Sequence, residues 1–350
     1  MTTIPLPSPH EIKTQRPASR KIEAFITQAR ETARQIIHGK DPRKALIVGP
    51  CSIHDCKSAI AYAERIKALS LEVDSTCFLV MRAYVEKPRT STGWKGLLYD
   101  PHLDSSNDIN TGIMWTRELL LTLAEMQVPC ATEFVDPLAA LYFEDLITWG
   151  FIGARTSASQ PHRQFASGAN MPLGFKNSID GNLICAINGV LSAQSAHSLM
   201  HIDTHGKLCA IQTMVNPLSH IVLRGACEFT NYDAASVYLA MQMLRKSHLL
   251  ERLMIDCSHG NSQKRAEKQP EVFHSVLEQI EKGNSGIFGL MLESHLKSGN
   301  QPLTTDPSLL EHDISITDPC LCWDATEELI HSADRAFSAT SQKVMALSAP

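Results

Sequence analysis

The stretch KALIVGPC (residues 44–51) is a short, unbroken run of apolar residues that ends in glycine, proline and cysteine. Apolarity that is continuous rather than alternating is typical of a parallel β-strand buried on both faces. Further runs of this kind are TCFLVMR (76–82), VPCATEF (128–134), FIGART (151–156), MPLGFKN (171–177), HIVLRG (220–225), RLMIDCSH (252–259) and GIFGLMLE (286–293). The sequence therefore predicts eight buried parallel strands.

Helical patterns lie between most of these runs. They are KSAIAYAERIKALS (57–70), DINTGIMWTRELLLTLAEMQ (108–127), DPLAALYFEDLITWG (136–150), DAASVYLAMQMLRKSH (233–248) and PEVFHSVLEQIEKG (270–283). In the second of them, Ile109, Ile113, Leu120 and Leu123 form one apolar stripe. Strands that alternate with helices favour an α/β fold of the (β/α)8 TIM-barrel type, with a doubly wound open sheet as the alternative.

Two segments extend this barrel. Residues 1–43 form an N-terminal arm that ends in an expected helix, KIEAFITQARETARQIIHG (21–39). Residues 197–216, HSLMHIDTHGKLCAIQTMVN, have the pattern of a β-hairpin inserted before strand six. We therefore expect an arm over 1–43 and a catalytic barrel over 44–345.

Composition narrows the function. The 350-residue chain is 43% hydrophobic and 20% charged, so it can bury a sizeable core. Its net charge of −5 argues against a nucleic-acid partner. The first twenty residues have no signal-peptide core, and no apolar run approaches the length of a membrane span. With ten scattered cysteines and no CxxC motif, we expect a cytoplasmic protein with reduced thiols.

Each predicted strand stops at or beside an ionisable residue or a cysteine. These residues are Cys51, Arg82, Glu133, Arg155, Lys176, Arg224, His259 and Glu293. Strand ends face water, so a single polar residue there is ordinary, but a complete set is improbable in a chain with 20% charged residues. Chemistry in a barrel takes place at the carboxyl ends of the strands.

Four of these residues are cations that would meet at one mouth: Arg82, Arg155, Lys176 and Arg224. The loop RAYVEKPRTSTGWKG (82–96) adds Lys87, Arg89 and Lys95 against the single acid Glu86. Because like charges repel, such a group predicts anionic partners, and arginine binds phosphate and carboxylate groups in a bidentate manner. In an acidic chain this pattern favours small, multiply anionic substrates over a polymer.

A second group contains Cys51, His259 and Glu293, to which Asp318 in SITDPC is added. A thiolate, an imidazole and two carboxylates suit a divalent transition metal better than Mg²⁺ or Ca²⁺. The alternative is a buried thiol and a hydrogen-bonded core histidine, since the residues are far apart in sequence.

Several motifs closely resemble the 3-deoxy-D-arabino-heptulosonate 7-phosphate (DAHP) synthase family, in its short class I type. They are IVGPCSIHD (47–55), VMRAYVEKPRTSTGWKGL (80–97), IGARTSASQPHR (152–163), GFKN (174–177), MIDCSHGNSQK (254–264), GLMLESH (289–295) and SITDPCLCW (315–323). The resemblance implies a transferase that condenses phosphoenolpyruvate with erythrose 4-phosphate and releases phosphate. This reaction is the first step of the shikimate pathway to chorismate and the aromatic amino acids.

The resemblance also implies roles for single residues. Cys51, His259, Glu293 and Asp318 would hold one divalent ion, which is Mn²⁺, Fe²⁺, Co²⁺ or Zn²⁺. Arg82, Arg155, Lys176 and Arg224 would bind the phosphoenolpyruvate anion, supported by Glu133 and Lys95. Arg89 and Thr90 would hold the erythrose phosphate, and Lys87 would lie near the aldehyde. The residues expected to take part in catalysis are Lys87, Arg82, Lys176 and Glu133.

The chain departs from the family pattern at several loop positions. Ser157-Ala158 replace Thr-Glu, Ser178-Ile179 replace Gly-Thr, and Ala226 replaces a second glycine. No proposed ligand is lost, so we expect activity with altered loop geometry. The alternatives are a sibling synthase that uses another sugar such as arabinose 5-phosphate, and a non-catalytic paralogue that senses metabolites.

Regulation and assembly are further expectations from the resemblance. Many relatives bind phenylalanine, tyrosine or tryptophan in a pocket built from the arm, the hairpin and the segments around 136–141 and 165–171. Here Asn170 and His201 stand where small serines are common, so we expect weak or altered feedback inhibition. The arm and the hairpin are expected contact surfaces of a homodimer or homotetramer. Cys320 is expected to approach Cys51 and to form a disulfide with it when metal is lost under oxidation.

Overall fold

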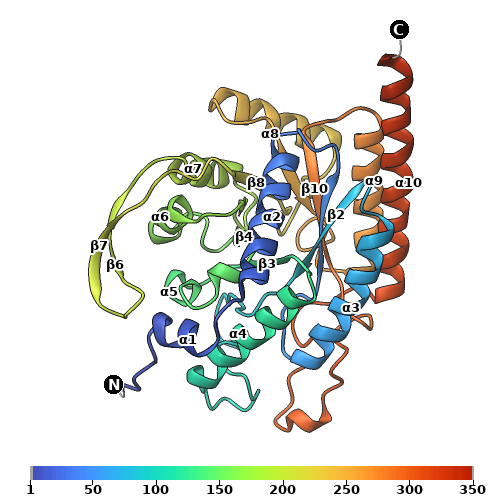
Figure 1. The fold of residues 1–350 in the computed structure, drawn as a ribbon. Helices are drawn as coiled ribbons and strands as arrows, with labels where there is room; N and C mark the ends of the chain where they lie inside the picture. Colours follow the sequence, from blue (N-terminus) through green and yellow to red (C-terminus); the bar gives the residue numbers. More distant parts are fainter. Residues whose placement is uncertain (1–2, 349–350) are drawn as a thin grey trace.

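The computed structural model describes residues 3–348, with side chains described as far as residue 339. Its centre is a closed barrel of parallel strands in the order β1-β10-β9-β8-β5-β4-β3-β2 (Figure 1). The strands are β1 (Lys44–Gly49), β2 (Cys77–Arg82), β3 (Cys130–Glu133), β4 (Trp149–Ile152), β5 (Leu173–Lys176), β8 (Ser219–Leu223), β9 (Leu253–Asp256) and β10 (Ile287–Glu293). The predicted TIM barrel is confirmed, and the open-sheet alternative is wrong.

Closure depends on β1, which pairs with β2 on one side and with β10, the last strand, on the other. Ala45 lies opposite Phe78 in β2 and opposite Gly289 in β10, and both pairings are parallel. Parallel pairing places the carboxyl ends of all eight strands at one rim. The ionisable residues at the strand ends are therefore brought to the same side of the molecule.

Alternate residues of each strand face two different cores. Leu46 and Val48 point outward into the core between barrel and helices, whereas Ala45 and Ile47 point into the barrel. The interior also contains large side chains such as Trp149, and its buried apolar residues pack as one cluster. Both faces of the strands are thus buried, which is why their sequences are continuously apolar.

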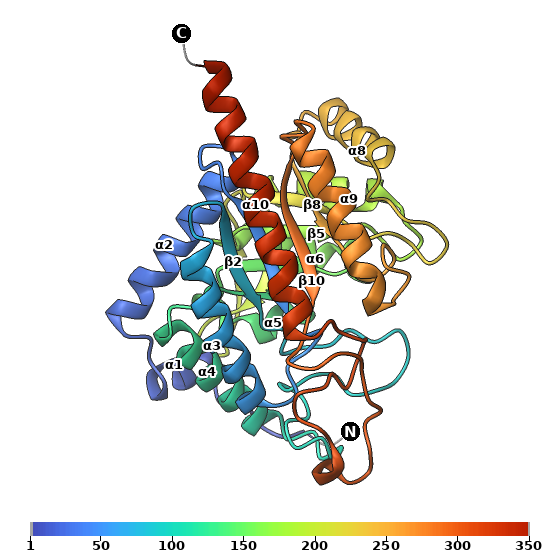
Figure 2. The ribbon, with the colours of Figure 1, turned by 90° about the vertical axis from the view of Figure 1, so that its right-hand side faces the viewer.

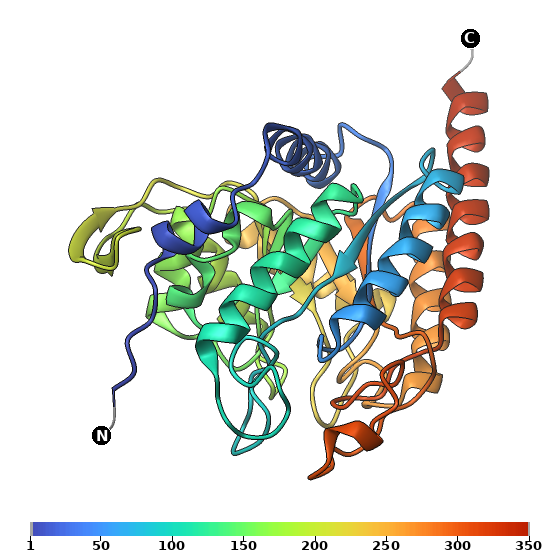
Figure 3. The same cartoon turned by 60° about the horizontal axis from the view of Figure 1, so that its bottom comes forward.

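The helix predicted in the N-terminal arm is α2 (Arg20–Ile37). Its residues Ala33, Ile36 and Ile37 belong to the core inside the barrel. Figure 3 shows α2 across one end of the barrel, on the side opposite the long loops that follow β2 and β10. The helix therefore closes the amino end and leaves the carboxyl end for the loops.

Most predicted helices are present around the barrel. They are α3 (Cys56–Glu72), α4 (Ile109–Glu125), α8 (Ala234–Lys246) and α9 (Gln269–Glu281). On α4 the stripe residues Ile113, Leu120 and Leu123 are buried, and Asp108 accepts a hydrogen bond from the Thr111 amide at its N-terminus. Helices α6 (Gln160–Gly168), α7 (Leu183–Ala193) and α10 (Trp323–Ser348) were not among the predicted ones. Figure 2 shows α10 beside α9 on the outside of the barrel.

The continuous helix predicted over 136–150 is wrong. This segment contains only one turn of α-helix, α5 (Pro137–Ala140), and one 3₁₀ turn, η1 (Glu144–Leu146), before β4 begins. Its carbonyl groups are bound from outside the segment. Arg117 Nη1 donates to Tyr142 O at 2.9 Å, and Arg30 Nε donates to Ile147 O at 2.9 Å. Tertiary hydrogen bonds from two arginines thus replace part of the helical pattern, while turn hydrogen bonds such as that from the Tyr142 amide to Ala139 O remain within the segment.

The inserted hairpin is confirmed as β6 (Ser198–Ile202) and β7 (Leu208–Gln212), which pair in antiparallel register. It extends away from the barrel beyond α5, α6 and α7 (Figure 1). The short helix α1 (Pro9–Gln15) contacts the turn of the hairpin, because the His10 amide donates to Thr204 O at 2.7 Å. Among the helices in the described part of the chain, none combines the length and the apolar character that crossing a bilayer requires.

Candidate active site at the carboxyl ends of the strands

A narrow pocket lies at the carboxyl rim, and most of the predicted site residues line it. Those lining it are Cys51, Arg82, Lys87, Glu133, Arg155, Lys176, Arg224, His259, Glu293 and Asp318. Tyr84, Cys227 and Lys264 also line it, and sequence reasoning did not single them out. Arg89, Thr90 and Lys95 are absent from the described wall of this pocket.

Arg82 is the last residue of β2 and is almost fully buried at the centre of the rim. Its Nη2 atom lies 3.1 Å from Glu293 Oε1, and its guanidinium carbon lies 4.0 Å from the centre of the Tyr84 ring. Gly49 makes this position possible, because a Cβ atom there would lie 2.9 Å from Arg82 O. The barrel thus holds one cation rigidly beneath the pocket.

Lys176, at the end of β5, forms a second buried ion pair. Its Nζ atom lies 2.9 Å from Asp256 Oδ2, and Asp256 also lies 2.9 Å from His259 Nδ1. Burial acts to raise the pKa of Asp256, but Lys176 and His259 hold it well below its usual value. Asp256 therefore stays ionised and connects a proposed substrate cation to a proposed metal ligand.

Three of the four predicted metal ligands form one cluster. Ligand atoms of Cys51, Glu293 and Asp318 all lie within 4.8 Å of one another. His259 reaches this cluster through Glu293, because its Nε2 atom lies 3.5 Å from Glu293 Oε1. Burial raises the pKa of the Cys51 thiol to about 12, with the Glu293 charge adding to the effect. A thiol, an imidazole and two carboxylates are a donor set that fits a divalent transition ion.

The ammonium group of Lys87 lies within this cluster. Its Nζ atom is 2.8 Å from Cys51 Sγ and 3.0 Å from Asp318 Oδ2. Burial acts to lower the pKa of Lys87, but the charges of Cys51 and Asp318 raise it above its usual value. Lys87 is thus a protonated group beside the ligand atoms, as a proton donor for the pocket would be.

Arg155 and Arg224 are the two arginines of the pocket without a carboxylate partner among the described residues, and Lys264 likewise has none. Arg224 is buried and donates to Gly225 O at 3.1 Å, whereas Arg155 is exposed and donates from Nε to Thr90 Oγ1 at 2.9 Å. Burial lowers the pKa of Arg224, which anions in the pocket would counteract. These two guanidinium groups are available for an external anion.

The loop after β2 folds back on itself. The Lys87 amide donates to Lys95 O at 2.8 Å, and Arg89 Nε donates to Trp94 O at 2.7 Å. Lys95 is exposed, so its side chain is not placed in the pocket. Gly96 has a φ of +113°, and a Cβ atom there would lie 2.3 Å from Val85 O, so only glycine fits.

Glu86, the single acid of this loop, does not neutralise its cations. It is buried, and its carboxylate accepts hydrogen bonds from the amides of Val135 and Asp136 and from the Tyr99 hydroxyl. Burial raises the pKa of Glu86 to about 8, although these hydrogen bonds oppose the effect. The positive field of the pocket is therefore left uncompensated on this side.

Comparison with known proteins agrees with this geometry. Residues 18–331 match the DAHP synthetase I family. The chain is 45% identical to the Tyr-sensitive phospho-2-dehydro-3-deoxyheptonate aldolase of Escherichia coli strain K12 over 325 residues, which cover 93% of this chain and 91% of that protein. It is 41% identical to the Trp-sensitive enzyme of the same strain, with 93% of each chain covered.

The chain belongs to the DAHP synthetase I family. A solved structure agrees with this assignment. The phospho-2-dehydro-3-deoxyheptonate aldolase from Francisella tularensis SCHU S4 superposes with a TM-score of 0.94 at 38% identity and covers 97% of this chain and 98% of its own. The recognition made from the motifs is thus confirmed over nearly the whole chain.

Of the departures from the family pattern, Ile179 lines the pocket. Ser157 is buried outside the pocket wall, with its Oγ atom 3.5 Å from Cys185 Sγ. The Ala226 amide donates a hydrogen bond to Phe229 O at 2.8 Å, which closes a turn. Cys320 is buried with its Sγ atom 3.7 Å from Asp318 O, and its thiol is free. Its disulfide with Cys51 stays a prediction.

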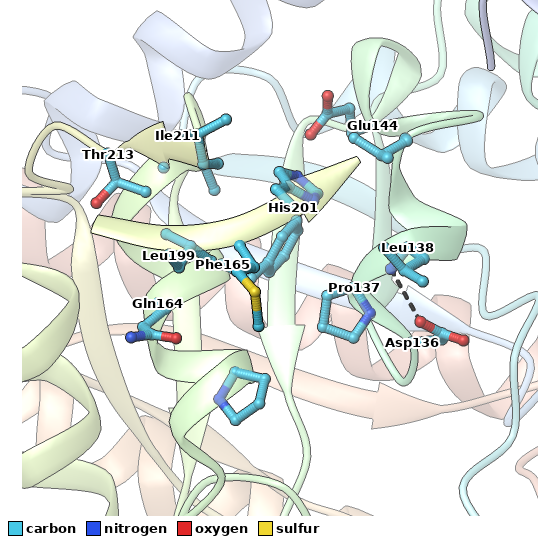
Figure 4. Close-up of a pocket in the computed structure, with 15 residues that line it drawn as sticks. Asp136, Pro137, Leu138, Glu144, Gln164, Phe165, Leu199, His201, Ile211 and Thr213 are labelled. Atoms are coloured by element: carbon cyan, nitrogen blue, oxygen red, sulfur yellow. Dashed lines mark hydrogen bonds between the residues drawn. The ribbon is translucent and has the colours of Figure 1, made fainter. Parts of the chain in front are cut away.

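A second cavity of about 400 Å³ lies between the hairpin and the outer helices (Figure 4). Figure 4 shows Leu199 and His201 on a hairpin strand that crosses the cavity, with Phe165 and Pro137 on the facing side. The segments predicted around 136–141 and 165–171 both line it. The arm does not line it within the described residues, and Asn170 is exposed beside Ala169 rather than in the wall.

Proposed function

We propose that the pocket at the carboxyl rim is where this chain, a DAHP synthase and therefore a transferase, condenses phosphoenolpyruvate with erythrose 4-phosphate. The products are DAHP and inorganic phosphate, and the reaction opens the shikimate pathway to the aromatic amino acids. The observation that carries the proposal is the meeting of two carboxylate-free guanidinium groups with a thiol–carboxylate cluster in one narrow pocket. We expect the reaction to take place in the cytoplasm, where the ten cysteines stay reduced.

Phosphoenolpyruvate is assigned to the buried side of the pocket. Arg82 and Lys176 are held by Glu293 and Asp256, so they present fixed positive charge to its carboxylate. Arg155 and Arg224 bind its phosphate, in keeping with the bidentate preference of guanidinium groups. Glu133 and Lys95 are proposed to support this region. The Glu133 carboxylate fills the space beside Gly153, because a Cβ atom at residue 153 would lie 2.0 Å from Glu133 Oε1, and a larger residue there would displace this carboxylate.

Erythrose 4-phosphate is assigned to the outer side, at Arg89 and Thr90. The Thr90 hydroxyl accepts a hydrogen bond from Arg155, so the element for the sugar phosphate touches a residue of the phosphoenolpyruvate site. Because both substrates are anions that repel each other, shared cations lower the free energy needed to bring them together. Carbon 3 of phosphoenolpyruvate then attacks the aldehyde carbon.

Cys51, His259, Glu293 and Asp318 are the proposed ligands of one divalent ion, which is Mn²⁺, Fe²⁺, Co²⁺ or Zn²⁺. When bound, such an ion supplies Lewis-acid polarisation of the aldehyde. Asp256 accepts the Nδ1 proton of His259 and so directs Nε2 toward the cluster. Lys87 donates a proton to the new alkoxide. Water adds at carbon 2 of phosphoenolpyruvate, which becomes electron-deficient when carbon 3 attacks, and phosphate then leaves. Arg82 and Lys176 stabilise the negative charge of the neighbouring carboxylate throughout.

The test is release of inorganic phosphate from phosphoenolpyruvate in the presence of erythrose 4-phosphate and Mn²⁺, compared among wild type, Cys51→Ala and Cys130→Ala. Cys130 is a buried cysteine of β3 and serves as the matched control. We expect activity in wild type and Cys130→Ala only. Equal turnover with arabinose 5-phosphate would favour a sibling synthase, and no turnover with either sugar would favour a non-catalytic paralogue.

The second cavity is the proposed site of an aromatic amino acid effector. The family members compared above carry the names Tyr-sensitive and Trp-sensitive. Here the imidazole of His201 occupies part of the wall, and burial lowers its pKa, so it is neutral at pH 7. An imidazole ring takes up more room than the small serine common in relatives, which leaves less space for the ligand. Feedback inhibition is therefore expected to be weak or altered.

Inhibition assays with phenylalanine, tyrosine and tryptophan test this assignment. Wild type should resist sub-millimolar concentrations of all three, and His201→Ser should become sensitive to one of them. His205→Ser, on the exposed turn of the same hairpin, is the control and should behave as wild type. Sub-millimolar inhibition of the wild type would contradict the expected weakness.

A homodimer or homotetramer is the proposed assembly, with the hairpin and the arm as contact surfaces. Met200 and Leu208 on the hairpin are 82% and 78% exposed, which is unusual for large apolar side chains. Sedimentation of wild type and of Met200→Ser/Leu208→Ser checks this, because the double variant should dissociate at a higher protein concentration than wild type.

A further inference from the structure

A third cavity lies outside both sites described above. It has a volume of about 570 Å³ and is enclosed by α3, α4, the segment 97–103 after the substrate loop, and the segment 307–312. Figure 3 shows the loops that follow β2 and β10 on the same side of the molecule. This volume falls within the range of small-molecule sites.

The wall of the cavity is mostly apolar. Ile60 on α3, Leu119 on α4, and Leu97, Leu103 and Leu310 from the two segments line it. Trp115 of α4 adds an aromatic ring that is 37% exposed and stands edge to face with His102 at 5.2 Å between ring centres. Such a wall favours a flat apolar body over a sugar or a peptide.

The polar groups at the rim already have partners. His312 Nδ1 lies 3.3 Å from Asp55 Oδ2, and His102 Nε2 lies 3.6 Å from Asp108 Oδ2. Glu118 is paired with Arg16 Nε at 2.7 Å. Since these groups are already engaged with each other, they offer few free hydrogen-bonding positions to a ligand.

His54 is the exception. It is 5% exposed, it lines the cavity, and neither of its ring nitrogens has a hydrogen-bond partner among the described residues. Burial lowers the pKa of His54 to about 4, with His295 adding to the effect, so the ring is neutral at pH 7. A neutral imidazole presents one N–H donor and one acceptor, and leaving both unpaired in a buried place is unfavourable.

We propose that this cavity binds a small, uncharged aromatic molecule whose hydroxyl group hydrogen-bonds to the imidazole of His54. A hydroxyl group can donate to one ring nitrogen or accept from the other, which matches what a neutral imidazole offers. Both nitrogens are closed to solvent in this structure, so the ring has to turn toward the cavity to meet the ligand. A carboxylate is a poorer match, because Lys57 is the cation in the described wall and it is exposed to water. The site is independent of the assigned reaction, since neither substrate carries an aromatic ring.

The experiment uses the full chain with 4-bromophenol as probe and bromobenzene as the matched molecule without a hydroxyl group. Anomalous scattering from bromine in soaked crystals locates each probe, and ligand-observed NMR gives its affinity in solution. His54→Leu keeps an apolar side chain but removes both nitrogens, and His54→Gln retains a donor and an acceptor.

We expect 4-bromophenol in this cavity of the wild type, with its oxygen next to His54. His54→Leu should weaken its binding by about fivefold or more and leave bromobenzene binding unchanged. His54→Gln should retain most of the preference for the phenol. His201→Leu, in the cavity under the hairpin, should have no effect.

Several results would overturn the proposal. They are equal binding of 4-bromophenol to wild type and His54→Leu, its location only in the cavity under the hairpin, and no binding at all. A second copy of the chain that covers the cavity, or only a water molecule on His54, also excludes it. If His54→Leu fails to fold, Thr122→Trp, which fills the cavity from α4, should abolish binding, and unchanged binding to it counts against the site.

Discussion

At the scale of single residues, the rim of the barrel depends on buried polar side chains that serve more than one partner. Asp256 is the clearest example, because one carboxylate accepts from Lys176, His259 and Ser258. Removing such a charge would leave a buried ammonium group unpaired, which is more harmful than losing an exposed pair. Glu86 is a second residue of this kind, whereas the buried hydroxyl of Tyr84 has no partner among the described residues, and each leads to a prediction.

Tyr84→Phe should increase stability and impair substrate binding. The Tyr84 ring packs against Arg82, but its buried hydroxyl has no partner among the described residues. Removing an unpaired hydroxyl should raise the free energy of unfolding by about 1 kcal/mol. If the hydroxyl donates to phosphoenolpyruvate, KM for this substrate should rise about tenfold. Urea denaturation and steady-state kinetics check both effects, and a rise in neither would show that water satisfies the hydroxyl.

Glu86→Gln should become relatively more stable as pH rises. The folded-state pKa of Glu86 is raised to about 8, so the folded protein binds more protons than the unfolded chain between about pH 4.5 and 8. Wild-type stability therefore falls with rising pH through this window, by up to about 1.4 kcal/mol per pH unit from this group. Glutamine does not ionise, so the free energy of unfolding of Glu86→Gln minus that of wild type should increase from pH 5 to pH 8. Urea titrations at four pH values measure it, and a constant difference would contradict the assignment.

At the scale of elements, local helical preference gives way to tertiary hydrogen bonds in the segment 136–150. Arg117 of α4 is 1% exposed and donates to Arg16 O, Tyr142 O and both carboxylate oxygens of Asp145. These bonds hold α5 and η1 against α4 and the arm. The same segment lines the proposed effector cavity, so its irregular backbone shapes that cavity.

Arg117→Met should destabilise the fold by about 3 kcal/mol, because buried carbonyl groups and Asp145 lose their partner. Arg16→Met is the matched control. The Arg16 side chain is 46% exposed and pairs with Glu118 at the surface, so its loss should change the free energy of unfolding by less than about 1 kcal/mol. Urea denaturation measures both variants. Similar values for the two would mean that α4 does not organise this segment.

At the scale of the whole molecule, the proposed metal ligands come from remote parts of the chain. Cys51 follows β1, His259 follows β9, Glu293 ends β10, and Asp318 lies in the segment before α10. Only closure of the barrel, in which β1 pairs with β10 and β10 with β9, brings these residues together. Metal binding should therefore be linked to global folding.

Mn²⁺ at about 100 times its Kd should raise the free energy of unfolding of the wild type by about 2.7 kcal/mol. Cys51→Ser should lose this increment, whereas Cys130→Ser should retain it even if its basal stability is lower. Denaturation with Mn²⁺ and with chelator measures the increment for each protein. The same increment in Cys51→Ser would place the ion elsewhere.

The barrel itself follows from the sequence, because strands buried on both faces must be continuously apolar. All eight apolar runs contain a strand, although β4 begins at Trp149, before the run 151–156, and ends at Ile152. The amphipathic stretch 108–127 contains helix α4, and Ile113, Leu120 and Leu123 of its stripe are buried. Helices such as α7 were not predicted from the sequence, because they are apolar on most sides and lack a clear apolar stripe. The role of Asp256 was not predicted, although the residue lies within the run 252–259. Its position inside a strand gives no sign of a functional role until Lys176 and His259 are known to lie beside it.

The sequence by itself determined the fold class, the family and which residue types gather at the rim, because these depend on the period of apolar residues and on motifs local in the chain. Tertiary structure alone decided that Lys87 lies between Cys51 and Asp318, that Glu86 turns away from the cations, and that 136–150 is not one helix. It also left His54 unpaired beside a cavity. The physical reason is that hydrogen-bond partners and burial are set by segments distant in sequence, which only packing places side by side.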